Sequence, residues 1–159
     1  MCYTFIVSTE ETPAYIAIVD NAGREKRQRV EYAVTDVRGE TVYVTSEGLK
    51  YIRDSLWAKA RQRFLLSELN RIRDVISKPG IVIWDPMASG DTLIYYKRLY
   101  VKPERRHWLV AAVVKLRQGL KFLYNFHLQE SSKVKGYHLD VPPEIWYLNP
   151  RQQKRTFGL

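Results

Sequence analysis

The segment "LVAAVVKLRQGLKFLYNFH", from Leu109 to His127, is the part of this chain that decides its fold. Two apolar runs flank a basic turn that contains a glycine, which is typical of an antiparallel hairpin. In a strand, successive side chains point to opposite faces of the sheet. The second run therefore predicts an aromatic face with Phe122, Tyr124 and Phe126, and an opposite face with Leu123, Asn125 and His127.

Strand-like runs of the same kind precede the hairpin. The runs "IVIWDP" (81–86) and "TLIYYKRLYV" (92–101) are joined by short connections to "WLVAAVVK" (108–115) and "KFLYNFH" (121–127). Short connections favour an antiparallel meander. Because "WLVAAVV" is apolar on both faces, we expect it at the centre of a four-stranded antiparallel sheet.

A helical stripe lies before these strands. Apolar residues recur at spacings of three and four over residues 46–76, and Thr45 or Ser46 can cap the start. The sequence "SKPG" (77–80) ends the pattern. A single helix of about 30 residues is long for a globular protein, so we expect a break within residues 58–64 and hence two helices.

The N-terminal third has a strand pattern. Residues 2–9 and 14–20 predict a strand pair, residues 21–29 a charged turn, and residues 30–37 and 41–45 a second hairpin. The chain is therefore predicted to be α+β, with N-terminal strands and a helical pair packed on the four-stranded antiparallel sheet.

At 159 residues, the chain fits one domain covering residues 1–159. Residues 131–159 contain three of the prolines and end in a basic sequence, which predicts an irregular C-terminal strap. The apolar runs are too short to span a membrane. A single cysteine and an N-terminus without a signal-peptide pattern predict a cytoplasmic protein that does not enter a membrane.

The charge balance points to an acidic partner. The chain has 26 Lys and Arg residues against 17 Asp and Glu residues, a formal net charge of +9. This excess is typical of proteins that bind nucleic acid. The alternative is a soluble basic protein without such a partner.

The sequence argues against several chemistries. The three histidines have no metal-ligand spacing, and no phosphate-loop or nucleophile-elbow pattern is present, so we expect neither a metal nor a cofactor. Cys2 would become a terminal nucleophile if Met1 were removed. The alternative is a cysteine packed at the start of a strand.

Basic and aromatic residues crowd the hairpin connections. Lys and Arg suit phosphates, and aromatic rings suit unstacked bases, so the mixture favours contact with single-stranded RNA. Cross-strand aromatic pairs with solvated strand ends explain the same residues without RNA. The candidate RNA-binding residues are Tyr96, Arg98, Arg105, Arg106, Arg117 and Lys121.

RNA cleavage without a metal needs a base for the 2′-hydroxyl, an acid for the leaving oxygen and fixed positive charge. His127 can serve as the base, Lys97 or Lys115 as the acid, and Arg98 as the charge. Asn125 can hold a phosphate oxygen or orient the substrate. The alternative is a structural histidine at a strand end.

The order of these motifs resembles the BECR group, the phage-associated barnase-, EndoU-, colicin- and RelE-like nucleases. The similarity covers residues 41–128 and rests on "LNRIRDVISKPGIVIWDP", "TLIYYKRLY", "WLVAAVVK" and "GLKFLYNFH". Carried over by position, Lys97 and Lys115 match two strand lysines, and Asn125 and His127 match the ends of the closing triplet. The chain departs from the family pattern at two positions. Members often have a histidine on the first helix where this chain has Tyr51-Ile52, and Asn125 stands where a hydroxyl residue is common.

The resemblance implies a metal-independent endoribonuclease, toxin-like or phage-borne, with RNA as substrate and an inhibitor or antitoxin protein as a further partner. Two other functions stay open on the sequence. The first is a non-catalytic RNA- or DNA-binding protein on the same scaffold, and the second is a basic protein-interaction module.

Overall fold

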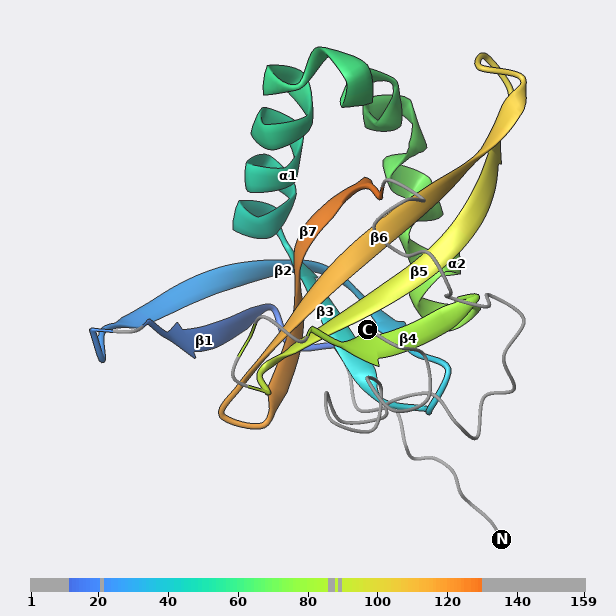
Figure 1. The fold of residues 1–159 in the computed structure, drawn as a ribbon. Coiled ribbons are helices and arrows are strands. Elements are labelled where there is room, and N and C mark those ends of the chain that lie inside the picture. The colour runs from blue at the N-terminus through green and yellow to red at the C-terminus, as the bar shows by residue number, and fades with distance from the viewer. Residues whose placement is uncertain (1–11, 21, 86–87, 89, 130–159) are drawn as a thin grey trace, which may run out of the picture.

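One mixed β-sheet with a helical layer on one face forms the molecule (Figure 1). The structure is a computed structural model, which describes residues 12–20, 22–85, 88 and 90–129. The strands are β1 (Tyr15–Val19), β2 (Glu25–Thr35), β3 (Thr41–Thr45), β4 (Ile81–Trp84), β5 (Thr92–Val101), β6 (Arg106–Arg117) and β7 (Leu120–Leu128). The helical elements are α1 (Ser46–Ala58), the 3₁₀ helix η2 (Ala60–Arg71) and α2 (Ile72–Ser77).

The α+β class is confirmed, but the expected four-stranded sheet is too small. Strands β4 to β7 do form the consecutive antiparallel meander, with β6 between β5 and β7. However, β3 adds to β7 in parallel, with Val42 opposite Lys121 and Tyr43 opposite Phe122. Within the described residues, the sheet therefore has seven strands in the order β1-β2-β3-β7-β6-β5-β4.

The N-terminal strands differ in part from the prediction. The hairpin between β2 and β3 is present. The segment 25–29, expected in a charged turn, instead opens β2 and pairs with β1. The sequence of this segment is polar throughout and its side chains are mostly exposed. It therefore lacks the alternation of apolar and polar residues that would have indicated a strand. The predicted strand at 2–9, Cys2 and the strap at 131–159 lie outside the described residues.

The helical layer follows the predicted cap and break. The Thr45 hydroxyl oxygen accepts a hydrogen bond from the backbone N–H of Gly48 at 3.0 Å, and α1 ends at Ala58. The chain then continues as η2 before α2. The long 3₁₀ stretch was not expected, because its apolar residues also fit a helix of 3.6 residues per turn.

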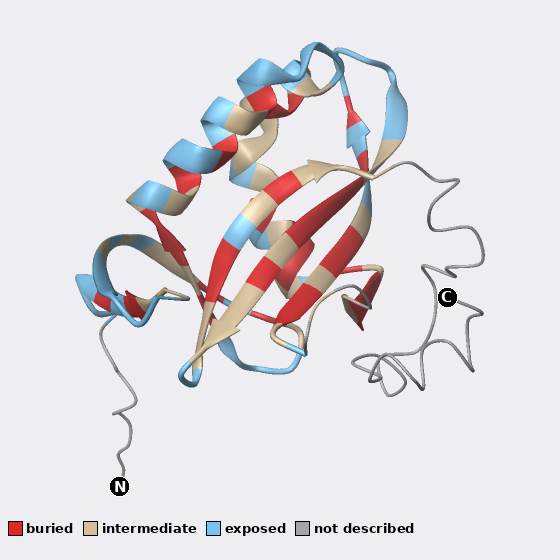
Figure 2. Cartoon of the chain, turned by 60° about the vertical axis from the view of Figure 1, so that its left-hand side comes forward, coloured by how far each residue is buried: buried red, intermediate tan, exposed pale blue. Residues whose placement is uncertain are grey.

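The main core lies between the helices and the sheet. Ile52 and Leu56 of α1 face it with almost no exposed surface, as do Ala112 of β6 and Phe126 of β7. Figure 2 shows α1 exposed on its outer side and buried toward the sheet. Each large apolar side chain buried here contributes about 1.5 to 3 kcal/mol to folding.

The β6–β7 hairpin has a two-residue loop and a bulge. Gln118 and Gly119 both have positive φ (51° and 79°), which suits the tight turns that match the twist of paired strands. The register shifts between Val113 and Val114, so Val113 lies opposite Asn125 and Val114 opposite Leu123. Tyr124 is the extra residue.

Because of this bulge, the side chains of β7 are distributed over its two faces differently from the prediction. Leu123 joins Phe126 in the main core, although strict alternation had placed them on opposite faces. Phe122 belongs to a separate cluster with Ile16 and Ile18. Asn125 and His127 do share one face of β7, because their register partners alternate with the core residues of β6.

Candidate functional site

His127 is positioned at the end of β7, opposite Ala111. Its Nδ1 atom lies 2.8 Å from the backbone oxygen of Leu128. A carbonyl oxygen can only accept a hydrogen bond, so Nδ1 carries the ring proton in this contact. The Nε2 atom of the neutral ring therefore keeps its lone pair and can accept a proton.

The surroundings of His127 favour the neutral ring. Burial lowers the pKa of His127 below its usual value, because the charged imidazolium loses water. The hydrogen bond to Leu128 acts in the opposite direction, and the positive charge of Lys59 lowers the pKa further. At neutral pH the imidazole is thus a proton acceptor.

A cavity of about 800 Å³ adjoins His127 where β6 begins and β7 ends. Arg61, Gln62 and Phe64 line it from η2, and Arg106 and Trp108 line it from β6. Glu104 lines it as well, so two guanidinium groups, one carboxylate, two aromatic rings and the imidazole meet in one space. We call it the His127 cavity.

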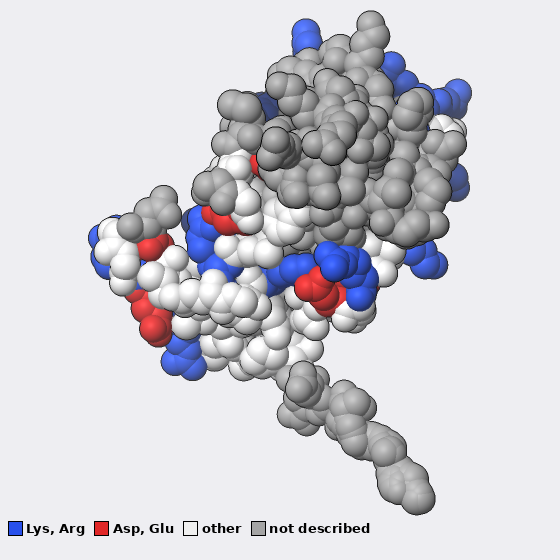
Figure 3. Space-filling view, turned by 60° about the horizontal axis from the view of Figure 1, so that its bottom comes forward, with Lys and Arg blue, Asp and Glu red and all other residues white. Residues whose placement is uncertain are grey.

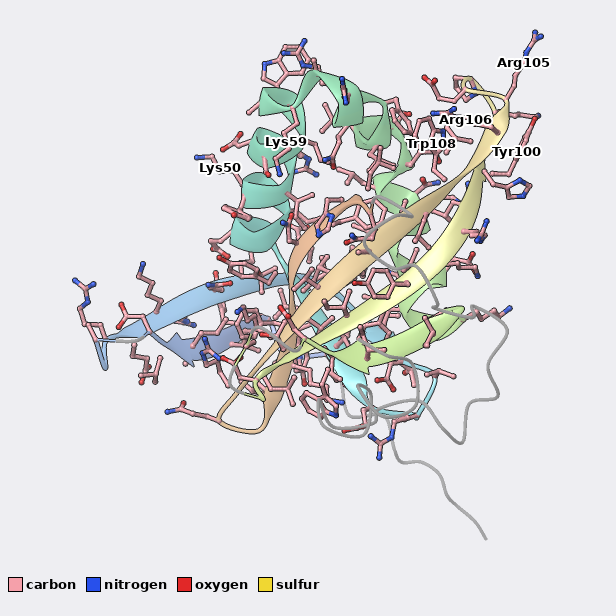
Figure 4. All side chains as sticks on the ribbon, viewed as in Figure 1. Lys50, Lys59, Tyr100, Arg105, Arg106 and Trp108 are labelled. Atoms are coloured by element: carbon pink, nitrogen blue, oxygen red, sulfur yellow. The ribbon has the colours of Figure 1, made fainter. Side chains whose placement is uncertain are left out.

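The start of β6 supplies a stacked cation. The guanidinium carbon of Arg106 lies 3.6 Å from the ring centroid of Trp108, and the Phe64 ring lies 5.1 Å from the same ring. Figure 4 shows Arg106 and Trp108 together at this end of the sheet, whereas Arg105 points away from the molecule. Within the described part of the chain, the indole Nε1 of Trp108 is buried without a hydrogen-bond partner.

The 3₁₀ helix is fixed to the end of β7. The side-chain oxygen of Gln62 accepts a hydrogen bond from the backbone N–H of Leu128 at 3.0 Å. Arg63 donates from Nε to the backbone oxygen of Trp57 at 2.6 Å, which secures the turn after α1. These two contacts fix the start of η2, which carries Arg61 and Phe64, against the end of β7.

Lys115 is on the same sheet face as His127 but lies further along β6, away from the His127 cavity. Ala111, opposite His127, is four residues from Lys115 along β6, a separation of roughly 13 Å in an extended strand. Lys115 lines a second cavity together with Arg117, whose guanidinium is paired with Asp91. This pairing also lowers the pKa of Asp91.

Lys97 lies on the opposite face. It is in register with Val110, which belongs to the core beneath the helices, and its Nζ contacts Asp74 of α2 at 2.9 Å. Asn125 accepts a hydrogen bond from the backbone N–H of Phe126 at 2.9 Å. The four expected catalytic residues therefore do not converge on one cavity.

The six candidate RNA-binding residues also separate. Tyr96 is buried in a small apolar cluster, and Lys121 contacts Glu40 at 2.9 Å while remaining only 11% exposed. Neither side chain is available to a strand of RNA. Arg98 and Arg105 are exposed on the β5–β6 hairpin, Arg117 is paired, and Arg106 alone lines the His127 cavity.

Most residues of this cavity were missed from the sequence. Arg61, Gln62, Phe64, Glu104 and Trp108 line it, and none of them was among the candidate site residues. The predicted break near residue 60 was the available signal, because a break ends the regular stripe and frees its residues to face elsewhere. It does not indicate where they face.

Lys97 gives the first test of these placements. If the chain cleaves RNA, as the sequence predicts, Lys97→Gln should leave cleavage and RNA affinity within about twofold of the unchanged protein, because the side chain pairs with Asp74 on the helical face. The loss of a partly exposed ion pair should cost at most about 1 kcal/mol of unfolding free energy. Cleavage assays and urea unfolding measure both, and a hundredfold loss of cleavage would return Lys97 to the active site.

The comparisons with known proteins leave the resemblance as an expectation. No family model, no curated protein and no solved structure matches this chain. Among the described residues, no group of three or more His, Cys, Asp or Glu side chains is placed to hold a metal ion. No helix in the described ranges is long and apolar enough to cross a membrane.

Proposed function

We propose that this protein binds single-stranded RNA in the His127 cavity and cleaves it there without a metal ion. The observation that carries the proposal is the contact of His127 Nδ1 with the Leu128 carbonyl oxygen, which leaves Nε2 as the acceptor of a neutral ring, in a cavity that Arg61 and Arg106 also line. A base of this kind next to fixed positive charge is what an attack by the RNA's own 2′-hydroxyl requires.

Binding follows from the charges and rings of the cavity. Arg61 and Arg106 can each hold a phosphate oxygen through paired N–H groups. Phe64 is partly exposed and offers aromatic surface to an unstacked base, whereas the Trp108 ring holds the Arg106 guanidinium in place.

Cleavage would proceed by transfer of the phosphate ester. Nε2 of His127 accepts the proton of the 2′-hydroxyl, and the 2′-oxygen forms a bond to phosphorus. The bond from phosphorus to the 5′-oxygen breaks, and that oxygen takes a proton from solvent, because Lys97 and Lys115 lie elsewhere. The products are a 2′,3′-cyclic phosphate and a 5′-hydroxyl end.

A second candidate function is RNA binding without cleavage. The separation of Lys97 and Lys115 from His127 favours it, since the expected acid is missing from the described wall of the cavity. The toxin-like or phage-borne role, the inhibitor protein and the cytoplasmic location remain predictions from the sequence.

The two neighbouring arginines give a matched test of binding. We expect Arg106→Gln to weaken binding of a labelled mixed-sequence RNA 12-mer by about tenfold or more, because a charged hydrogen bond contributes about 1.5 to 3 kcal/mol. The dependence of log affinity on log salt should flatten by about 0.7, the value for one lost phosphate contact on a single strand. Fluorescence anisotropy at several salt concentrations measures both quantities.

Arg105→Gln is the control, because Arg105 points away from the cavity (Figure 4). Its affinity should stay within about threefold. Equal losses in the two variants would indicate diffuse attraction to the hairpin tip rather than a site. Weak binding by the unchanged protein that does not respond to salt would leave the protein-interaction module.

A further inference from the structure

A second cavity, of about 520 Å³, lies between the β1–β2 ribbon, the start of α1 and the end of the β6–β7 hairpin near its loop. Small-ligand sites commonly measure roughly 300 to 1,000 Å³, so the space fits one small molecule. Gly48 keeps α1 close to β7 at this point, because a Cβ there would lie 3.1 Å from the backbone oxygen of Leu123.

Two partly exposed tyrosines form an aromatic surface in this cavity. The ring centroids of Tyr51 and Tyr124 are 5.5 Å apart with an angle of 34° between the rings. Tyr51 is 48% exposed and Tyr124 is 43% exposed, so much of each ring faces solvent. Exposed aromatic rings are the surfaces on which single-stranded bases stack.

Two ammonium groups accompany the rings. The Nζ of Lys115 lies 5.0 Å from the Tyr124 ring centroid, and Lys26 lines the same cavity. Among the described residues neither lysine forms a salt bridge, although the charge of Lys26 acts on Asp20 and that of Lys115 acts on Asp91. Arg117 and Asp20, by contrast, each have an opposite charge beside them. On the side that Figure 3 turns forward, several basic groups likewise lie next to acidic ones.

One carboxylate limits what the cavity can accept. Glu47 accepts the backbone N–H of Arg29 at 3.2 Å and keeps further lone pairs. Because Asp20 and Arg117 are each offset by a salt-bridge partner, Lys26, Lys115 and Glu47 leave an excess of one positive charge in the cavity. An anion with its own N–H or O–H donors suits this set better than a bare phosphate does.

We propose that this cavity binds a nucleotide unit, with its base against Tyr51 and Tyr124 and its phosphate at Lys26 and Lys115. Glu47 would accept a hydrogen bond from the ribose or the base. The inference rests on the proposed function for one part, namely that the nucleotide belongs to the RNA strand bound at His127.

The geometry of the sheet connects the two sites. In the register of β6 and β7, Lys115 pairs with Phe122, Val113 with Asn125 and Ala111 with His127. Lys115, Asn125 and His127 therefore follow one another along one face of the hairpin. The separation of roughly 13 Å corresponds to about four stacked nucleotides at 3.4 Å each. A dinucleotide can therefore fill one site only, whereas a hexanucleotide can reach both.

The test uses the full chain and probes that it cannot cleave. We would measure the affinity of 2′-O-methyl adenosine di- and hexanucleotides by fluorescence anisotropy, with AMP as competitor. Tyr124→Ala should weaken hexanucleotide binding by about 5- to 100-fold, since stacking contributes about 1 to 3 kcal/mol per base. Lys115→Gln should weaken it as well, and Tyr124→Phe should keep it within about twofold.

Tyr100→Ala is the matched control, because Tyr100 is exposed to a similar degree on a different hairpin. If AMP displaces the hexanucleotide, the cavity also binds free nucleotides; if AMP does not, the cavity binds only nucleotides within a strand. Either result is consistent with a nucleotide site. Unchanged hexanucleotide affinity in both Tyr124→Ala and Lys115→Gln would overturn the proposed nucleotide site. If those variants weaken binding and Arg106→Gln does not, the second site stands and the proposed function at His127 fails.

Discussion

His127→Ala should lower the rate of RNA cleavage by about 10² to 10⁴ while changing RNA affinity by less than about threefold, the usual effect of removing one acid–base group. The imidazole would contribute through proton transfer, whereas Arg61 and Arg106 would contribute the binding. Single-turnover cleavage of a labelled RNA and anisotropy on an uncleavable analogue separate these two quantities.

His107→Ala is the control, because His107 is exposed and its ring packs 5.2 Å from that of Tyr100, outside the cavity. It should cleave at the unchanged rate. Equal cleavage by the His127 variant would remove His127 from the mechanism. Absence of cleavage in every protein, with binding intact, would favour the second candidate function.

The pH dependence gives this prediction a second readout. Burial lowers the pKa of His127, so the rate should rise with pH and reach its plateau below the ordinary histidine value of about 6.5. Between about 6.5 and the lowered pKa, the unfolded chain binds more protons than the folded chain. Unfolding free energy should therefore fall as the pH falls through this window, and His127→Ala should reduce that loss.

Phe126→Ala should destabilise the protein by about 3 to 5 kcal/mol, because the ring is fully buried in the main core and its removal leaves a cavity. For a chain of this size, the melting temperature should fall by roughly 6 to 20 °C. Phe126 lies between Asn125 and His127, so its packing holds the end of β7 and the geometry of the proposed site.

Thermal and urea unfolding measure this effect, with Tyr124→Ala as the neighbouring control. Tyr124 is partly exposed at the bulge, and its replacement should cost about 1 kcal/mol or less. A loss below about 1 kcal/mol for Phe126→Ala would mean that the end of β7 is not anchored in the core.

Local patterns were enough to predict much of the fold. The meander of β4 to β7 follows from apolar runs with short connections, and α1 follows from the apolar spacing around Ile52. The charged segment 25–29 was misassigned because strand pairing with β1 overrides its composition. Tertiary pairing of that kind leaves no local signal.

The parallel contact of β3 with β7 was also beyond the sequence. Its register pairs, such as Val42 with Lys121, join segments separated by the helices and three other strands. Asp36, in the turn before β3, is buried and accepts a hydrogen bond from the Tyr95 hydroxyl at 2.6 Å, and Nζ of Lys121 in β7 lies 3.9 Å from the same carboxylate. A buried acid in a turn sequence gives no indication of such a partner.

The candidate site was predictable only in part. His127 and Arg106 were both named from the sequence, and the structure places both at one cavity. The face of Lys97 depends on where β5 pairs with β6, and the faces along β7 depend on the bulge at Tyr124. A single inserted residue reverses the side-chain pattern on one side of it, so alternation alone could not place these groups.

The most direct test of the central claim is the chemistry of the RNA ends that the purified protein produces in a strong chelator. We predict cleavage that persists in EDTA and yields 2′,3′-cyclic phosphate and 5′-hydroxyl ends, identified by mass spectrometry. RNA that stays intact, or fragments with 5′-phosphate and 3′-hydroxyl ends, would contradict attack by the 2′-hydroxyl with His127 as the base.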